Sequence, residues 1–199
     1  CKGFAKEFPS VALRIDTELM TAVSARVLAG SATLGVVSPR GLLPGLERKA
    51  LSRIWMVPVV SPRHPLAKLE GELSQKELAD TIQIVLSERA GTGVADQAVL
   101  SPRTWRVADL HTKHMMLRGG WGNLPEHLVH DDIEAGRLVA IRPEAWGEEE
   151  HTLYLSAVYR PDTTFGPAHQ WLLEQLGALC ATDSGTPRRR KPRARRTKG

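Results

Sequence analysis

The chain has 199 residues, of which 42% are hydrophobic and 25% are charged, a composition typical of a globular protein with a buried core. No stretch approaches the roughly 18 apolar residues of a membrane-spanning helix, and the N-terminus lacks a signal-peptide pattern, so neither membrane insertion nor export is supported. The net charge is +5, but residues 188–198 hold eight Lys and Arg, and without these eight cations the remaining chain carries −3.

The first third of the chain predicts a strand, a helix and a second strand. Residues 11–19 alternate apolar and polar side chains, as in a half-buried strand. Residues 19–31 place Leu19 and Val23 on one helical face before a glycine stop, and residues 32–39 are a short apolar run ended by Ser-Pro. Together they predict a β-α-β unit with parallel strands.

Strands and helices continue to alternate, which predicts an α/β fold. Residues 50–67 predict two strands or one long strand closed by Pro62 and Pro65, and residues 74–80 predict a short helix with a capping box. The remaining expected elements are strands at 81–88 and 104–108, a helix at 109–120 capped by Asp109, a helix at 124–136, strands at 137–143 and 151–161, and a helix at 166–180.

Both ends of the chain have distinctive compositions. Residues 182–199 lose hydrophobic side chains and gain Pro, Arg and Lys, which predicts a disordered basic tail that is either solubilising or a source of phosphate contacts. Because Cys1 opens the sequence inside an amphipathic stretch, we expect a piece of a longer protein. Two cysteines, Cys1 and Cys180, fit a reducing cytoplasm better than a disulfide-stapled secreted domain, although they leave a single bridge open.

Three stretches of the sequence resemble one known family. They are "MVPVVSPRHPLA" (56–67), "TWRVADLHTKHMMLRGGWGNLPEHLVHDDIEAGRLVAI" (104–141) and "LYLSAVYRPDTTFGPAHQWLLEQL" (153–176). The chain resembles, over residues 1–181, the effector-binding domain of LysR-type transcriptional regulators. The glycine-rich middle stretch is the most specific part of the resemblance.

The resemblance implies a fold like that of type 2 periplasmic binding proteins, with two α/β subdomains joined by two crossover strands. The implied ranges are about 1–61 and 145–181 for the first subdomain, about 62–144 for the second, and hinges near Pro62 and Pro143. It also implies that a first strand, which usually supplies part of the ligand site, is absent from this sequence.

The function implied by the resemblance is the effector-sensing and oligomerisation domain of a bacterial DNA-binding regulator. Such a domain holds a small molecule between its subdomains to modulate transcription, forms a homodimer or homotetramer, works in the cytoplasm, and reaches DNA through an N-terminal winged helix-turn-helix that is not present here. An alternative with the same fold is the periplasmic solute-binding protein of a transporter. An enzyme is the third option, but the sequence holds no nucleophile elbow, P-loop or zinc-protease motif.

Candidate ligand-binding residues follow from the rule that α/β folds bind ligands at strand carboxyl ends and helix N-termini. The candidates are Thr17, Ser38, Ser61, Ser87, Arg89, Trp105 and Asp109. Hydroxyls and one guanidinium suit a small carboxylate or another polar effector. The alternatives are turn formation for the Ser and Thr residues, exposure to solvent for Arg89, and a core or pocket-wall position for Trp105.

Two further patterns contain residue types that are common in functional sites. His111 with His114, and His127 with His130, have the i,i+3 spacing that places two imidazoles on one helical face, but no Cys or acidic pattern completes a metal site. The glycines at 119, 120 and 122 either bring neighbouring backbones close together or simply end a helix and form turns. We expect no metal and no cofactor, because "GTG" at 91–93 also lacks the rest of a dinucleotide fingerprint.

Overall fold

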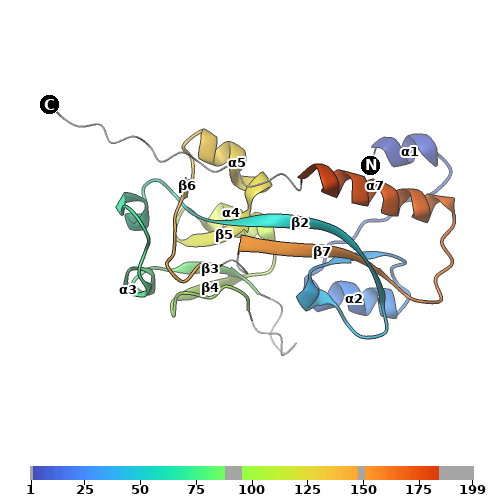
Figure 1. Cartoon of the computed structure of the whole chain (residues 1–199), viewed down its shortest axis with the longest axis horizontal. Helices are drawn as coiled ribbons and strands as arrows, with labels where there is room; N and C mark the ends of the chain where they lie inside the picture. The colour runs from blue at the N-terminus through green and yellow to red at the C-terminus, as the bar shows by residue number, and fades with distance from the viewer. Residues whose placement is uncertain (1, 88–95, 148–150, 184–199) are drawn as a thin grey trace.

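The computed structural model describes residues 2–87, 96–147 and 151–183 (Figure 1). Its elements are α1 (Lys2–Glu7), α2 (Met20–Leu28), β1 (Gly35–Val37), η1 (Pro39–Gly41), β2 (Glu47–Val60), η2 (Pro65–Lys68), α3 (Gln75–Ala79), β3 (Gln83–Leu86), β4 (Thr104–Val107), α4 (Leu110–Met116), β5 (Trp121–Pro125), α5 (Glu126–Glu134), β6 (Val139–Ala140), β7 (Thr152–Tyr159) and α7 (Pro167–Asp183). Within these described ranges, no helix combines the length and the hydropathy that a membrane crossing requires.

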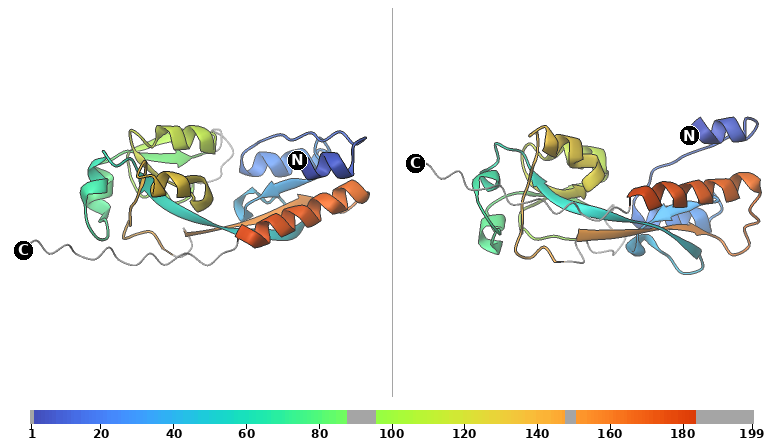
Figure 2. Two further views of the ribbon diagram at one scale, coloured as in Figure 1. Left: turned by 90° about the horizontal axis from the view of Figure 1, so that it is seen from above. Right: turned by 45° about the horizontal axis from the view of Figure 1, so that its top comes forward.

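One long strand, β2, connects two groups of elements. The strand order is β1-β7-β2-β5-β3-β4, with β6 also paired to β2. The first part of β2 pairs antiparallel with β7 as far as Trp55, and from Met56 onward it pairs antiparallel with β5. Figure 1 and Figure 2 show β2 and β7 running between a part that contains α1, α2 and α7 and a part that contains α3, α4 and α5. Two α/β parts are therefore joined by two long strands, as expected.

Each part has its own hydrophobic core. The part with α4 and α5 contains two clusters. In the first, these two helices pack against the sheet, and in the second, η2 and α3 pack against the sheet. The members are Val59, Ile84, Leu117, Leu124, Val129 and Leu138 in the first, and Val60, Leu66, Leu73, Leu78, Trp121 and Ile141 in the second. The other part is centred on Val27, Val37 and Val158, which join α2, β1 and β7.

The predicted strand at 11–19 is wrong. Residues 12–19 form no regular element, and Ile15 is 68% exposed although its side chain is apolar. The alternating pattern is present, but a strand needs a neighbour to accept its backbone hydrogen bonds, and β1 is paired with β7 alone among the described strands. The predicted parallel β-α-β unit is also wrong, because its first strand is absent and β1 pairs antiparallel with β7 instead.

The predictions that rest on local helix signals are confirmed. Ser74 and Glu77 form a reciprocal capping box at the start of α3, and Asp109 caps α4. Residues 50–67 contain one long strand rather than two. Helix α7 continues to Asp183, two residues into the predicted tail, and the rest of the tail lies outside the described residues.

The glycine-rich segment lies in and beside β5, where the backbones of β3 and β5 approach closely. A Cβ at Gly120 would stand 2.6 Å from the carbonyl oxygen of Ile82, and one at Gly122 would stand 2.8 Å from that of Ile84. These distances leave no room for a side chain. Of the two interpretations of these glycines, close backbone approach is the one that the structure supports at Gly120 and Gly122.

Candidate functional site

The carboxyl ends of three parallel strands meet at one edge of the sheet. β3 runs parallel to β4 and β5. The end of β5, at Pro125, pairs with Met56, which is the residue where β2 changes its partner from β7 to β5. This edge, which we call the carboxyl edge, therefore faces the junction of the two parts. Carboxyl edges of this kind are where open α/β sheets bind ligands.

Two candidate residues lie together at the carboxyl edge. Ser87 directly follows β3, is half-buried, and donates its backbone N–H to the carbonyl oxygen of Val107 at 3.0 Å. Asp109 comes two residues after the end of β4, the strand paired with β3, so it lies at the same edge of the sheet as Ser87. Trp105 is in the middle of β4 and is 45% exposed, with its ring 3.6 Å from the position that a Cβ of Gly119 would take. Trp105 is therefore not a core residue, and its position in a pocket wall or in contact with a ligand stays a prediction.

The carboxylate of Asp109 is already engaged with its own helix. It accepts hydrogen bonds from the backbone N–H and the Oγ1 of Thr112, both at 2.7 Å. The hydrogen bond from the backbone N–H of Thr112 has the larger effect and the one from its hydroxyl the smaller, and both hold the pKa of Asp109 below its ordinary value. The side chain is therefore ionised at neutral pH. Asp109 thus caps α4, and a role in ligand binding stays a prediction.

Ser61 lies at the opposite edge of the same sheet. β2 and β5 are antiparallel, and Val60 is paired with Trp121 at the beginning of β5. Ser61 therefore adjoins the amino ends of the parallel strands, and its Oγ accepts the N–H of Arg63 at 3.4 Å. The structure does not bring Ser61 together with Ser87 and Asp109.

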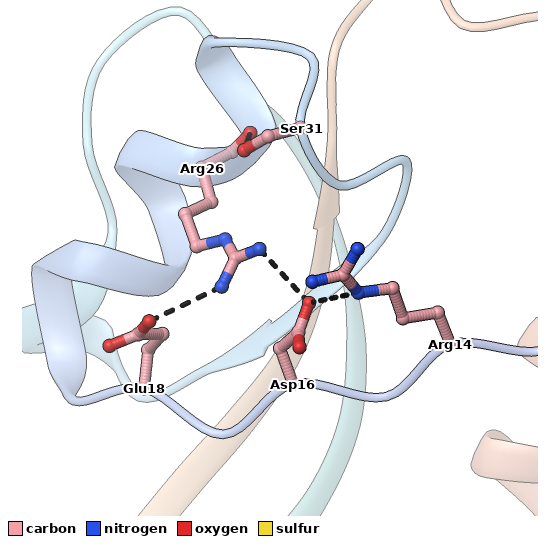
Figure 3. A network of polar contacts seen from close by, with 5 residues as sticks. All are labelled: Arg14, Asp16, Glu18, Arg26 and Ser31. Carbon is pink, nitrogen blue, oxygen red and sulfur yellow. Dashed lines mark hydrogen bonds and ion pairs between the residues drawn. The ribbon is translucent and has the colours of Figure 1, made fainter.

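Ser38 and Thr17 belong to the other part. Ser38 precedes η1 without a side-chain capping bond. Thr17 is exposed, between two acidic residues that both pair with Arg26 of α2: Asp16 Oδ2 at 2.9 Å and Glu18 Oε1 at 3.2 Å (Figure 3). Arg14 also contacts Asp16, at 3.3 Å. This network fixes the segment around Thr17 against α2.

Arg89 and the "GTG" at 91–93 lie outside the described residues. The four helical histidines differ in their surroundings. His114 Nε2 lies 2.7 Å from Oδ2 of Asp132, a carboxylate that Arg137 also contacts, whereas His111, His127 and His130 are exposed. Across the described ranges, no three His, Cys, Asp or Glu side chains are grouped as a metal site.

Lys113 is a buried cation that the candidate residues did not include. It lies on α4 and is 3% exposed, and its Nζ donates to Oδ1 of Asn123 on β5 at 2.8 Å. Burial lowers the pKa of Lys113 to about 8. The sequence held a signal for it, since Lys113 occupies the apolar stripe of α4 between Leu110 and Leu117.

A cavity of about 180 Å³ lies away from these residues, between η2 and the region of β6. None of the candidate residues contributes to its lining, which consists of Leu66, Ala67, Leu69, Gly71, Leu73, Val139, Ala140, Ile141 and Arg142. It lies near the amino ends of the parallel strands, because Ile141 donates its N–H to the carbonyl oxygen of Pro58 and β6 pairs with the end of β2.

Comparison with known proteins gives one consistent similarity. The family model described as the LysR substrate binding domain matches residues 1–181. The HTH-type transcriptional regulator AceR of Acinetobacter baumannii is 27% identical over 172 residues, which are 85% of this chain and 57% of AceR. The chain thus spans little more than half the length of this curated relative.

Solved structures show the same fold. The regulatory domain of MetR, a LysR family regulator from N. meningitidis, superposes with a TM-score of 0.68 at 18% identity, covering 92% of this chain and 86% of that one. The regulatory domain of CcmR from Synechocystis, solved in complex with 2-PG, gives a TM-score of 0.70 at 15% identity, covering 90% and 88%. The expected architecture of two α/β parts joined by two crossover strands is therefore confirmed.

Proposed function

Because the chain belongs to the LysR substrate-binding domain family, we propose that it is the effector-sensing and oligomerisation domain of a bacterial DNA-binding transcriptional regulator. The full protein binds DNA through an N-terminal winged helix-turn-helix, acts in the cytoplasm, and assembles as a homodimer or homotetramer. A small molecule, held between the two subdomains, shifts the balance between two arrangements of the assembly. That shift can be no larger than the difference in the effector's binding free energy for the two arrangements.

The family match over residues 1–181 carries this proposal, and two features of the structure support the location of the effector. The carboxyl edge faces the junction of the two parts, and Ser87 and Asp109 lie on it. Thr17, Ser38 and Arg89 complete the proposed polar lining from other segments. Ser61 and Trp105 contribute less directly to this region, since one adjoins the opposite sheet edge and the other is in mid-strand.

The division into subdomains is proposed on the same basis. The ranges are about 1–61 with 145–181, and about 62–144, followed by the basic tail at 182–199. We place the bending between the subdomains in the crossover strands, near the expected hinges at Pro62 and Pro143. The change of partner along β2 between Trp55 and Met56, a few residues before Pro62, supports this proposal. The effector acts at this junction when it closes the carboxyl edge against the first subdomain.

The test is a gel-shift and footprinting experiment with the full-length protein and the intergenic DNA upstream of its gene. It is run with and without a panel of small organic acids and amino acids. Specific binding whose affinity or footprint changes with one compound supports the regulator and identifies its effector class. A protein that binds no specific DNA, yet is stabilised by a small molecule, is instead a solute-binding protein, and the proposal fails.

A further inference from the structure

Four polar or charged side chains are buried among the described residues, and each makes a hydrogen bond: Ser24, Gln83, Ser101 and Lys113; the buried indole Nε1 atoms of Trp55, Trp121 and Trp146 make none. The amide of Gln83, 1% exposed, donates to Ala98 O at 2.6 Å and accepts the N–H groups of Leu100 and Ser101 at 2.8 and 3.0 Å. Ser24 and Ser101 each donate to a backbone carbonyl oxygen. Lys113 differs, because its ammonium has three donors and a single acceptor, the neutral amide of Asn123, in the described part of the chain.

No acidic side chain of the described residues compensates the charge of Lys113. Asp109, one turn earlier on α4, is engaged with Thr112, and Asp132, on the neighbouring α5, is engaged with His114 and Arg137. With a pKa of about 8, Lys113 is still mainly protonated at pH 7. A buried ammonium without an anionic partner is costly, and structural burial alone gives no reason for a charged group at this position.

The local backbone is shaped to admit this side chain. A Cβ at Gly122 would stand 3.1 Å from Cε of Lys113, so the absence of a side chain there leaves the path for the lysine stem toward Asn123. Asn123 is only half-buried, and it is followed by the last two residues of β5 at the carboxyl edge. Asn123 thus lies two residues before the end of β5, and its half-buried amide is the more exposed member of the Lys113–Asn123 pair.

We propose that Lys113 and Asn123 anchor the anionic group of the effector, a carboxylate or a phosphate, beside β5 and two residues before its end. This inference rests on the proposed function and names the chemical class of its ligand. The anion supplies the missing counter-charge of Lys113, while Asn123 offers its amide N–H₂ to a second oxygen. A charge-assisted hydrogen bond of this kind is stronger than a neutral one.

The test measures melting temperature and calorimetric binding with acetate, succinate and inorganic phosphate, each compared with sodium chloride at equal ionic strength. We expect at least one anion to raise the melting temperature of the wild-type protein by about 3–6 °C at ten times its Kd. Succinate or acetate acting alone assigns a carboxylate ligand, and phosphate acting alone assigns a phosphate ligand. No shift with any of the three overturns the inference.

Two variants separate the charge from the packing of the side chain. Lys113→Met retains the stem, and Lys113→Gln retains a donor for Asn123; both should melt at or above the wild-type temperature without anion and lose about 10- to 100-fold in anion affinity. Lys76→Met, which removes an exposed lysine of α3, is the matched control and should bind as the wild type does. Equal anion affinity of wild type and both Lys113 variants overturns the inference.

The DNA-binding experiment separates a failure of the anion anchor from a failure of the regulator proposal. If an effector changes DNA binding of the wild type and of Lys113→Met to the same extent, the regulator proposal stands and the anion anchor fails. If the wild type binds no specific DNA while the anions still depend on Lys113, the anchor stands without the regulator.

Discussion

Gly122 on β5 lies directly against Ile84 on β3, so that a Cβ added to the glycine would be 2.8 Å from the isoleucine carbonyl oxygen. The same Cβ would be 3.4 Å from Cδ2 of Leu117 on α4. One glycine thus sets the spacing of two parallel strands and of the helix that covers them. The arrangement also positions α4, on which both Asp109 and Lys113 depend.

Gly122→Ala should destabilise the protein by about 1–3 kcal/mol, because the obstructing atom belongs to the backbone and cannot rotate away. Chemical denaturation followed by circular dichroism measures this change. Gly177→Ala is the control: it lies in α7 with nothing within 4 Å of a new Cβ, and alanine should stabilise the helix by about 0.5–1 kcal/mol. Equal stability of Gly122→Ala and wild type would show that the strands separate without cost.

Local signals in the sequence predicted local structure well. Ser74 and Glu77 carry the whole capping box within four residues, and Asp109 likewise caps a helix using a neighbour three positions away. Strand pairing is different, because it depends on a partner far away in the chain. The segment at 11–19 has the alternation of a strand but no partner among the described strands, and the sequence alone could not reveal this.

The site was predicted in part for the same reason. Ser87 and Asp109 follow strands that proved to be neighbours, so the strand-end rule placed both on one edge. Ser61 also follows a strand, but the antiparallel direction of β2 carries it to the other edge. Lys113 was missed because charged side chains on a short helix are usually exposed. Only the structure shows that its side chain is buried and that its stem passes close to Gly122.

The unpaired state of residues 11–19 leads to a contrast between two apolar side chains. Ile15→Ser should change the free energy of unfolding by less than about 0.5 kcal/mol, since Ile15 is 68% exposed. Val27→Ala, which shortens a fully buried side chain of α2 packed with Val37 and Val158, should cost about 1–3 kcal/mol. Urea denaturation of both variants measures these changes. A large loss of unfolding free energy in Ile15→Ser would show that this residue is buried in solution.

Asp132 links α4 to the end of α5 through His114 and Arg137. The hydrogen bond from Arg137, followed by that from His114, lowers the pKa of Asp132 below its ordinary 3.8. The resulting stabilisation is therefore present above pH 4 and is lost as the pH falls through the lowered pKa. Asp132→Asn should cost about 0.5–1 kcal/mol at pH 7, and its difference from wild type should narrow below about pH 4.

Denaturation at several pH values between 3 and 7 tests the role of Asp132. Asp131→Asn is the matched control, because Arg137 contacts only the backbone carbonyl oxygen of Asp131, which the substitution retains. A difference between Asp132→Asn and wild type that stays constant down to pH 3 would assign the stabilisation to packing rather than to the carboxylate charge.

Lys113 should also make stability rise with pH, but at the alkaline end. Its pKa falls from 10.5 to about 8 on burial, so between these values the unfolded chain binds a proton that the folded protein has released. Stability therefore rises with pH across this window, and the full cost of the buried charge applies below pH 8. Lys113→Met has no such proton, so its advantage over wild type should shrink by on the order of 3 kcal/mol between pH 7.5 and 10.5. An advantage that does not change with pH would mean that the ammonium is solvated in the folded protein, because solvation would keep its pKa near 10.5.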